Sequence, residues 1–147
     1  IFTTLWSKLD PYYKYPIVNG MNDFHLINHN GKTLNFAGYN RMYEIAVHFL
    51  TDALKKSKGK RRVVVTHHVP TNLCNPSEYV GNSLNSAFVN SLGELIENNK
   101  IDYWVYGHHH RNLPTVELGK TKILTNQLGY INFGENKGFD LGACFEI

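Results

Sequence analysis

Histidines gather at the ends of two apolar runs, residues 63–66 and 101–106, and the set consists of His67, His68, His108, His109 and His110. Imidazole is the commonest protein ligand for transition metals, so this grouping favours a metal site. In an extended segment alternate side chains share one side, which makes His108 and His110 the expected ligands and His109 a bystander.

The two apolar runs are expected to be buried strands that bring the histidines together. Residues 63–66 are β-branched, and residues 101–106 are apolar and aromatic. A helix is predicted between them, capped by Asn85 or Ser86 and ended by Asn98 and Asn99; its buried face would consist of Phe88, Leu92, Leu95 and Ile96. A strand, a helix and a strand in succession predict a right-handed βαβ unit with parallel strands. Both histidine groups would then emerge at the carboxyl edge of one sheet, where α/β folds bind ligands.

The rest of the chain predicts one compact α/β unit. A strand is expected over residues 1–6 and a loop over 10–16, whose Tyr12, Tyr13 and Tyr15 would cover the core. Short strands over 113–118, 122–125 and 142–147, separated by glycine turns, predict an antiparallel finish.

Two further segments precede the first histidine group. Asn30 and Gly31 signal a hairpin, and Asp23 and His25 are read as part of its solvated polar face rather than as ligands. An amphipathic helix is predicted over residues 39–58, with a buried face formed by Met42, Ile45, Ala46, Phe49, Leu50, Ala53 and Leu54.

Composition by itself gives no support to a nucleic-acid binder or a membrane-spanning protein. A net charge of +3 is too small to argue for a nucleic-acid binder, and no apolar run is long enough to span a bilayer. The basic run 55–62 is interpreted as a solvated helix end. Cys74 and Cys144 form no CxxC pair. The chain begins at Ile1 without methionine, so it is expected to be a fragment; its compartment stays open, with the cytoplasm favoured.

The two histidine blocks, in this order, resemble the calcineurin-like metallophosphoesterase family. Residues 63–70 match a valine-rich strand that ends in histidine, and residues 107–110 match the later Gly-His-x-His block; residues 4–7 and 21–24 also resemble bacterial members. The resemblance implies an α/β fold, namely the C-terminal part of a four-layer β-sandwich with flanking helices, in which a parallel βαβ unit precedes antiparallel strands. Residues 1–147 would be a partial domain whose N-terminal part is the missing partner.

The resemblance also implies a dinuclear centre that hydrolyses a phosphoester. His67 and His108 would ligate one divalent ion and His110 the other, the ions being Mn, Fe or Zn. His68 and His109 would lie outside the ligand set and could approach the substrate. The Asp-x-His, bridging Asp and Gly-Asn-His blocks of the family are absent, so we expect no catalytic residue here, weak metal affinity and little turnover.

The loop 71–85 is expected to form a wall of the pocket, and the proposed substrate contacts are Asn75, Tyr79, Asn82 and Arg111. A surface loop and a surface cation are the alternatives. Two other functions compete with hydrolysis. One is a non-catalytic module in which Cys74 or a carboxylate completes a single structural zinc site. The other is nucleic-acid binding by the basic run 55–62, although neither a dedicated nucleic-acid partner nor a membrane is expected.

Overall fold

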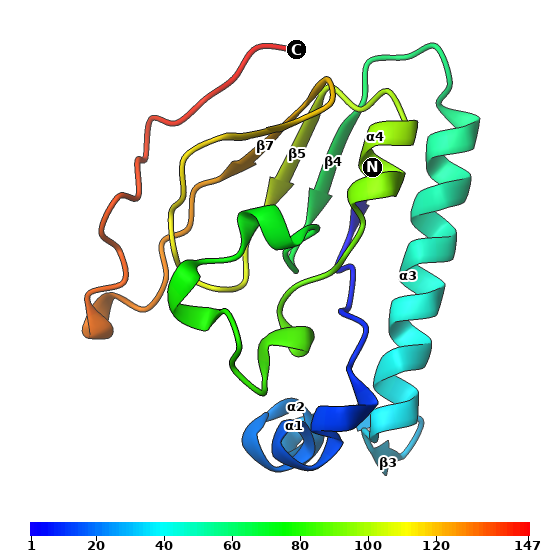
Figure 1. Cartoon of the computed structure of the whole chain (residues 1–147), viewed down its shortest axis with the longest axis vertical. Coiled ribbons are helices and arrows are strands. Elements are labelled where there is room, and N and C mark those ends of the chain that lie inside the picture. The colour runs from blue at the N-terminus through cyan, green and yellow to red at the C-terminus, as the bar shows by residue number, and fades with distance from the viewer.

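A five-stranded mixed sheet forms the centre of the chain in the computed structural model, which describes all residues 1–147 (Figure 1). Its strands, in spatial order, are β1 (Phe2–Thr3), β4 (Val63–Thr66), β5 (Tyr103–Tyr106), β7 (Thr121–Thr125) and β6 (Val116–Leu118). The strands β1, β4, β5 and β7 are parallel to one another, and the edge strand β6 runs antiparallel to β7. The parallel β4–β5 pair confirms the predicted βαβ unit, and β6 with β7 supplies the antiparallel strands.

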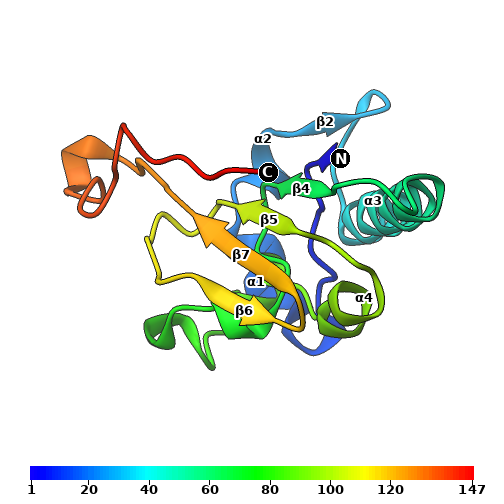
Figure 2. The same cartoon turned by 90° about the horizontal axis from the view of Figure 1, so that it is seen from above.

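One face of the sheet is buried under two helices, α3 (Phe36–Lys56) and α4 (Gly93–Asn98). Val64 and Trp104 pair in register on this face, and both are fully buried. On the opposite face Val65 and Tyr103 are only half buried, and the ring of Phe145 lies 4.5 Å from that of Tyr103. Figure 2 shows α3 and α4 together on one side of the molecule and the orange-to-red C-terminal segment on the other. The second face therefore has only partial cover.

Helix α3 presents a different face to the core from the one predicted. Asn35 caps its start by accepting a hydrogen bond from the backbone N–H of Gly38. The residues it buries are Tyr39, Ala46, Leu50 and Leu54. Ile45 and Phe49 are 56% and 49% exposed, so the prediction that both are buried was wrong. The apolar stripe is wider than the helix face that contacts the sheet, which leaves one flank outside.

A second apolar cluster lies at the far end of α3 and contains Leu9, Ile17, Met21, Phe24, Leu34, Tyr39 and Ala87. The predicted loop over 10–16 is instead the 3₁₀ turn η1 (Pro11–Tyr13) and the start of α1 (Lys14–Gly20). Asp10 caps η1 by accepting from the backbone N–H of Tyr12. Tyr12 and Tyr15 are 84% and 81% exposed, so these tyrosines do not cover the core as predicted.

The hairpin at Asn30 and Gly31 is confirmed by the antiparallel pair β2 (Asn28–His29) and β3 (Lys32–Thr33). Both turn residues have positive φ, as a two-residue hairpin turn requires. Asp23 and His25, in contrast, lie on the short helix α2 (Asp23–Leu26) rather than on the hairpin. The capping backbone N–H of Ile27 bonds to the carbonyl of Asp23 and closes this helical turn.

The connection from β4 to β5 contains three 3₁₀ turns before α4: η2 (Asn72–Cys74), η3 (Ser77–Tyr79) and η4 (Asn85–Ala87). One continuous helix from Asn85 or Ser86 was predicted, and that prediction was wrong. Between η4 and α4 the backbone is extended rather than helical, because Val89 forms a parallel β-bridge with Val69. The predicted end at Asn98 is confirmed.

Two other predictions fail for local reasons. Arg62, read as part of a solvated turn, is buried, and its guanidinium donates to the carbonyls of Ser57 and Lys100. The predicted strand over residues 142–147 is exposed coil, which follows the 3₁₀ turn η5 (Ile131–Phe133) and two glycines with positive φ. None of the helices combines the length and the apolar character needed to cross a bilayer.

Candidate functional site

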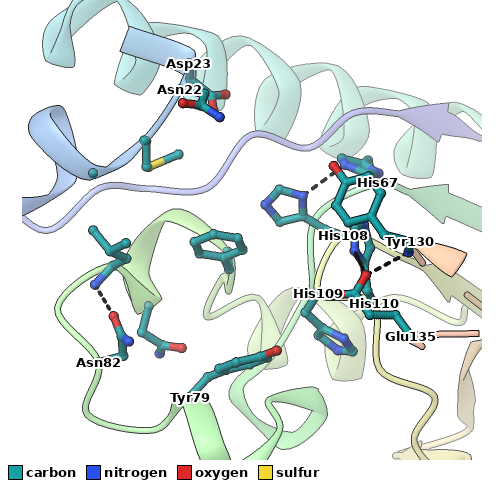
Figure 3. A pocket seen from close by; sticks show the side chains of 15 residues that line it. Asn22, Asp23, His67, Tyr79, Asn82, His108, His109, His110, Tyr130 and Glu135 are labelled. Carbon is teal, nitrogen blue, oxygen red and sulfur yellow. Dashed lines mark hydrogen bonds and ion pairs between the residues drawn. The ribbon is translucent and has the colours of Figure 1, made fainter. Parts of the chain in front are cut away.

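The two histidine groups meet where β4 and β5 end, as predicted for parallel neighbours. The backbone N–H of Gly107 donates to the carbonyl of His67 over 3.0 Å and ties the two strand exits together. Nδ1 of His108 and Nε2 of His67 lie 3.0 Å apart (Figure 3). Two nitrogens from segments 41 residues apart in the chain therefore face each other at one sheet edge.

The backbone after β5 turns sharply rather than continuing as a strand. His108 and His110 have φ of +85° and +55°, in the left-handed region that favours glycine. A non-glycine residue in that region carries strain, which persists only where surrounding contacts fix it. All three histidines line the open site, but His109 is buried whereas His108 and His110 are half buried.

The ring of His108 is held between two other rings. It stacks on His68, with centroids 4.1 Å apart and an angle of 17°, and on Phe88 at 4.6 Å and 28°. Burial, together with the neighbouring His67 and His110, lowers the pKa of His108 to about 3. Its Nε2 atom is buried and has no hydrogen-bond partner. His108 is thus a fixed, neutral imidazole at neutral pH.

His68 and His109 are buried, and their nitrogens bond to other groups of the chain. Nδ1 of His68 lies 2.8 Å from Oγ of Ser7, and burial lowers the pKa of His68 well below its usual value. His68 is therefore behind His108 rather than on the pocket wall. His109 donates from Nε2 to the carbonyl of Cys74 at 3.3 Å, and its Nδ1 accepts from the backbone N–H of Arg111.

Glu135 joins the histidines from the C-terminal segment, and nothing in the local sequence pattern marked it. Its Oε2 lies 2.8 Å from Nδ1 of His110 and accepts the backbone N–H of Tyr130 at 2.7 Å. The Tyr130 N–H and the His110 ring together lower the pKa of the Glu135 carboxyl. A carboxylate therefore lies beside the third candidate ligand.

Gln127 is a second residue that the sequence analysis missed. Its buried Oε1 accepts the backbone N–H of His110 at 2.8 Å, and its Nε2 donates to the carbonyl of Arg111 at 2.9 Å and to Oγ1 of Thr125 at 2.8 Å. The side chain of Asn112 donates from Nδ2 to the carbonyl of Gln127, and its Oδ1 accepts the backbone N–H of Gln127. One amide side chain thus fixes the turn that carries the histidines.

These groups open onto a pocket of about 630 Å³. Figure 3 shows His67, His108 and His110 on one side of it, Asn22 and Asp23 across from them, and Tyr79 and Asn82 along a third wall. Of the predicted substrate contacts, those that line the pocket are Tyr79, Asn82 and His109.

The other predicted contacts lie elsewhere. Nδ2 of Asn75 donates to Oδ1 of Asn85 at 3.1 Å, behind the wall that Asn85 presents to the pocket. The guanidinium of Arg111 donates from Nε to Oε1 of Glu78 over 2.7 Å at the surface. This ion pair connects the loop bearing Tyr79 to the segment that follows the histidines.

The residues present fit part of a metal site. Two nitrogens that bind one cation at about 2.0 to 2.1 Å, with an angle of about 90 to 110° at the cation, lie about 2.9 to 3.4 Å apart. The 3.0 Å between His67 and His108 falls within this range. However, no group of three or more His, Cys, Asp or Glu side chains is arranged to hold an ion. Cys74 packs fully buried in the core and does not line the pocket, so it cannot be the fourth ligand of the single-zinc alternative. The carboxylate version of that alternative keeps a candidate in Glu135, which lies beside His110.

Two comparisons with known proteins find matches to this chain. The sequence profile of the calcineurin-like phosphoesterase family matches residues 2–112, which include all five clustered histidines. An uncharacterized protein of Acanthamoeba polyphaga mimivirus is 30% identical over an alignment that covers 100% of this chain and 55% of the relative. The chain thus spans about half the length of this relative, which is viral and gives no support to the resemblance to bacterial members. No solved structure matches the chain significantly.

Proposed function

Because the chain belongs to the calcineurin-like phosphoesterase family, whose members hydrolyse phosphoesters with the help of divalent metals, we propose that it forms part of a dinuclear phosphoesterase centre. In this proposal His67 and His108 hold one divalent cation and His110 holds a second. The observation that carries it is the 3.0 Å separation between ring nitrogens of His67 and His108 at the ends of adjacent parallel strands.

The state of the histidines suits metal binding. Partial burial and the neighbouring His110 lower the pKa of His67, and burial lowers that of His108, so both rings are neutral at neutral pH. Without a metal their facing nitrogens share one hydrogen bond, whose proton would have to leave that position when a cation binds. Stacking between His68 and Phe88 holds the His108 ring in one orientation, which reduces the entropy lost on binding. When bound, two divalent cations would neutralise the phosphoryl charge and lower the pKa of a water for in-line attack.

The substrate is a phosphoester that enters the pocket beside the histidines. The loop 71–85 contributes Tyr79 and Asn82 to one wall of the pocket. The phenol of Tyr79 and the amide of Asn82 can form hydrogen bonds with the ester substituents. We propose Mn, Fe or Zn as the metal, since each accepts imidazole and carboxylate ligands. We propose no substrate contact for His68, Asn75 and Arg111, which do not line the pocket. They would support the residues that do.

We propose that residues 1–147 are the C-terminal portion of the catalytic domain. Two cations about 3.5 to 4 Å apart require bridging anions, and three neutral imidazoles supply none. The half-buried sheet face bearing Val65 and Tyr103 offers a surface on which a further layer could pack. The bridging carboxylate and the group that protonates the leaving oxygen would come from that layer.

The test is metal binding and hydrolysis by matched histidine variants. His67 is exposed, so His67→Ala should leave the fold intact but weaken Mn²⁺ or Zn²⁺ binding in calorimetric titrations. His48→Ala is the control, because His48 lies exposed on α3 and pairs only with Asp52. The control should bind metal like the unmodified chain.

Two results would count against the proposal. Equal metal affinity in the His67→Ala and His48→Ala proteins would show that His67 is not a metal ligand. Hydrolysis of p-nitrophenyl phosphate or its bis-ester by residues 1–147 with Mn²⁺, at about 1 s⁻¹ or faster, would show that the set of ligands proposed here is incomplete.

A further inference from the structure

We propose that Glu135 is a positioning residue, which holds His110 in the tautomer whose Nε2 lone pair would be free to bind a metal. This inference rests on the proposed function and extends it to a residue outside the histidine blocks. Its starting point is the 2.8 Å contact between Oε2 of Glu135 and Nδ1 of His110.

The contact determines where the proton of the imidazole lies. A carboxylate can only accept a hydrogen bond, so the neutral His110 ring must carry its proton on Nδ1 and donate it to Glu135. The lone pair is then on Nε2, the remaining nitrogen. Histidines that bind metals commonly donate their other N–H to a carboxylate, which orients the ring and makes the ligand more basic.

The backbone around Glu135 is shaped to bring the carboxylate to this position. Oε2 of Glu135 also accepts the backbone N–H of Tyr130 at 2.7 Å, and the Tyr130 ring packs edge-on against His110 with centroids 4.7 Å apart. Gly129 has φ of +63°, and a Cβ there would lie 2.6 Å from Cβ of Glu135 and 3.2 Å from Cβ of His110. Only glycine allows the three segments to approach so closely.

The other two candidate ligands have no such carboxylate. Nδ1 of His108 faces His67, and His108 is oriented by the rings stacked on both of its sides. Glu135 therefore makes the His110 side of the site different from the His67 and His108 side. Removing this carboxylate also leaves the backbone N–H of Tyr130 without its acceptor, but among the three candidate ligands it should affect only His110.

The first measurement is the tautomer of His110 in the ¹⁵N-labelled, metal-free chain, read from long-range ¹H–¹⁵N correlations at about pH 9, where an ordinary imidazole is neutral. We expect the Nδ1–H form in the unmodified chain and a shift toward the Nε2–H form in Glu135→Ala. Glu135→Gln should retain most of the Nδ1–H form, because its amide oxygen can still accept. Glu117→Gln, an exposed change on β6, is the control and should alter nothing. An Nε2–H form in the unmodified chain, or no change in Glu135→Ala, overturns the inference.

The second measurement is residue-specific broadening of histidine signals by Mn²⁺. In Glu135→Ala, the His110 signals should require about 10- to 100-fold more Mn²⁺ for the same broadening, while those of His67 should respond as before. Equal loss at both residues would indicate general damage and overturn a positioning role. If the unmodified chain shows no broadening at any histidine, the proposed function fails, and the tautomer measurement still decides the Glu135 contact.

Discussion

Replacing Gln127 with methionine should destabilise the whole protein, because this amide fixes the turn that carries the histidines. Gln127 is 7% exposed, and its side chain accepts from the N–H of His110 and donates to the carbonyl of Arg111. Methionine has a similar length and fills the same space, but it replaces neither bond. Thr125 keeps a partner, since its hydroxyl also donates to the carbonyl of Tyr106.

The size of the loss follows from the two backbone groups left without partners. Each unsatisfied, fully buried group costs about 1 to 3 kcal/mol. Both bonds are partly buried, so water can reach one side and the lower half of that range applies. We expect the free energy of unfolding to fall by about 2 to 4 kcal/mol, which lowers the urea midpoint by roughly 1 to 2 M at an unchanged slope.

Urea titration followed by tryptophan fluorescence measures this loss, since Trp6 and Trp104 both lie in packed regions. Asn132→Met is the matched control, because Asn132 is an exposed amide on η5, and its replacement should change stability by less than about 0.5 kcal/mol. A Gln127→Met midpoint equal to that of the control would refute the view that this side chain supports the histidine turn.

Three further outcomes follow from burial. Cys144 is exposed, whereas Cys74 is buried and burial raises its pKa to about 11, so a thiol reagent at about pH 8 should titrate one thiol before denaturation and both after it. Burial lowers the pKa of His108 from 6.5 to about 3, so the unfolded chain binds more protons between these values. The urea midpoint of the metal-free protein should therefore fall as pH decreases from about 6.5 toward 3, and less so in His108→Phe. On α3, Leu50→Ala should cost about 3 kcal/mol and Phe49→Ala less than about 1 kcal/mol, as unfolding titrations can measure; similar losses would contradict the observed helix face.

The elements that carry the clustered histidines were predictable because their signals are local. A β-branched run between a basic segment and a histidine pair indicates a buried strand, and β4 occupies the predicted residues 63–66. The parallel order then follows from the length of the connection, and with it the meeting of His67 and His108. These inferences required only pattern and handedness.

The errors arise where tertiary contacts outweigh local pattern. The periodicity of α3 marks an apolar stripe that includes Ile45 and Phe49, but periodicity does not say how much of the stripe the sheet can cover. Gln127 and Glu135 reach His110 from 17 and 25 residues away, within segments that have no regular pattern. Such contacts depend on how loops fold back, which propensities do not encode.

The left-handed backbone at His108 and His110 bears on how this protein would respond to selection in the laboratory. Residues other than glycine pay about 1 kcal/mol or more for such a conformation. A randomised library ranked by heat resistance alone should therefore enrich glycine at position 110 more than at position 108, because His110 has a part-exposed bond to Glu135 and an edge contact with Tyr130, whereas the His108 ring is stacked on both sides. Selection for thermal stability would therefore replace the His110 imidazole unless codon 110 is kept constant.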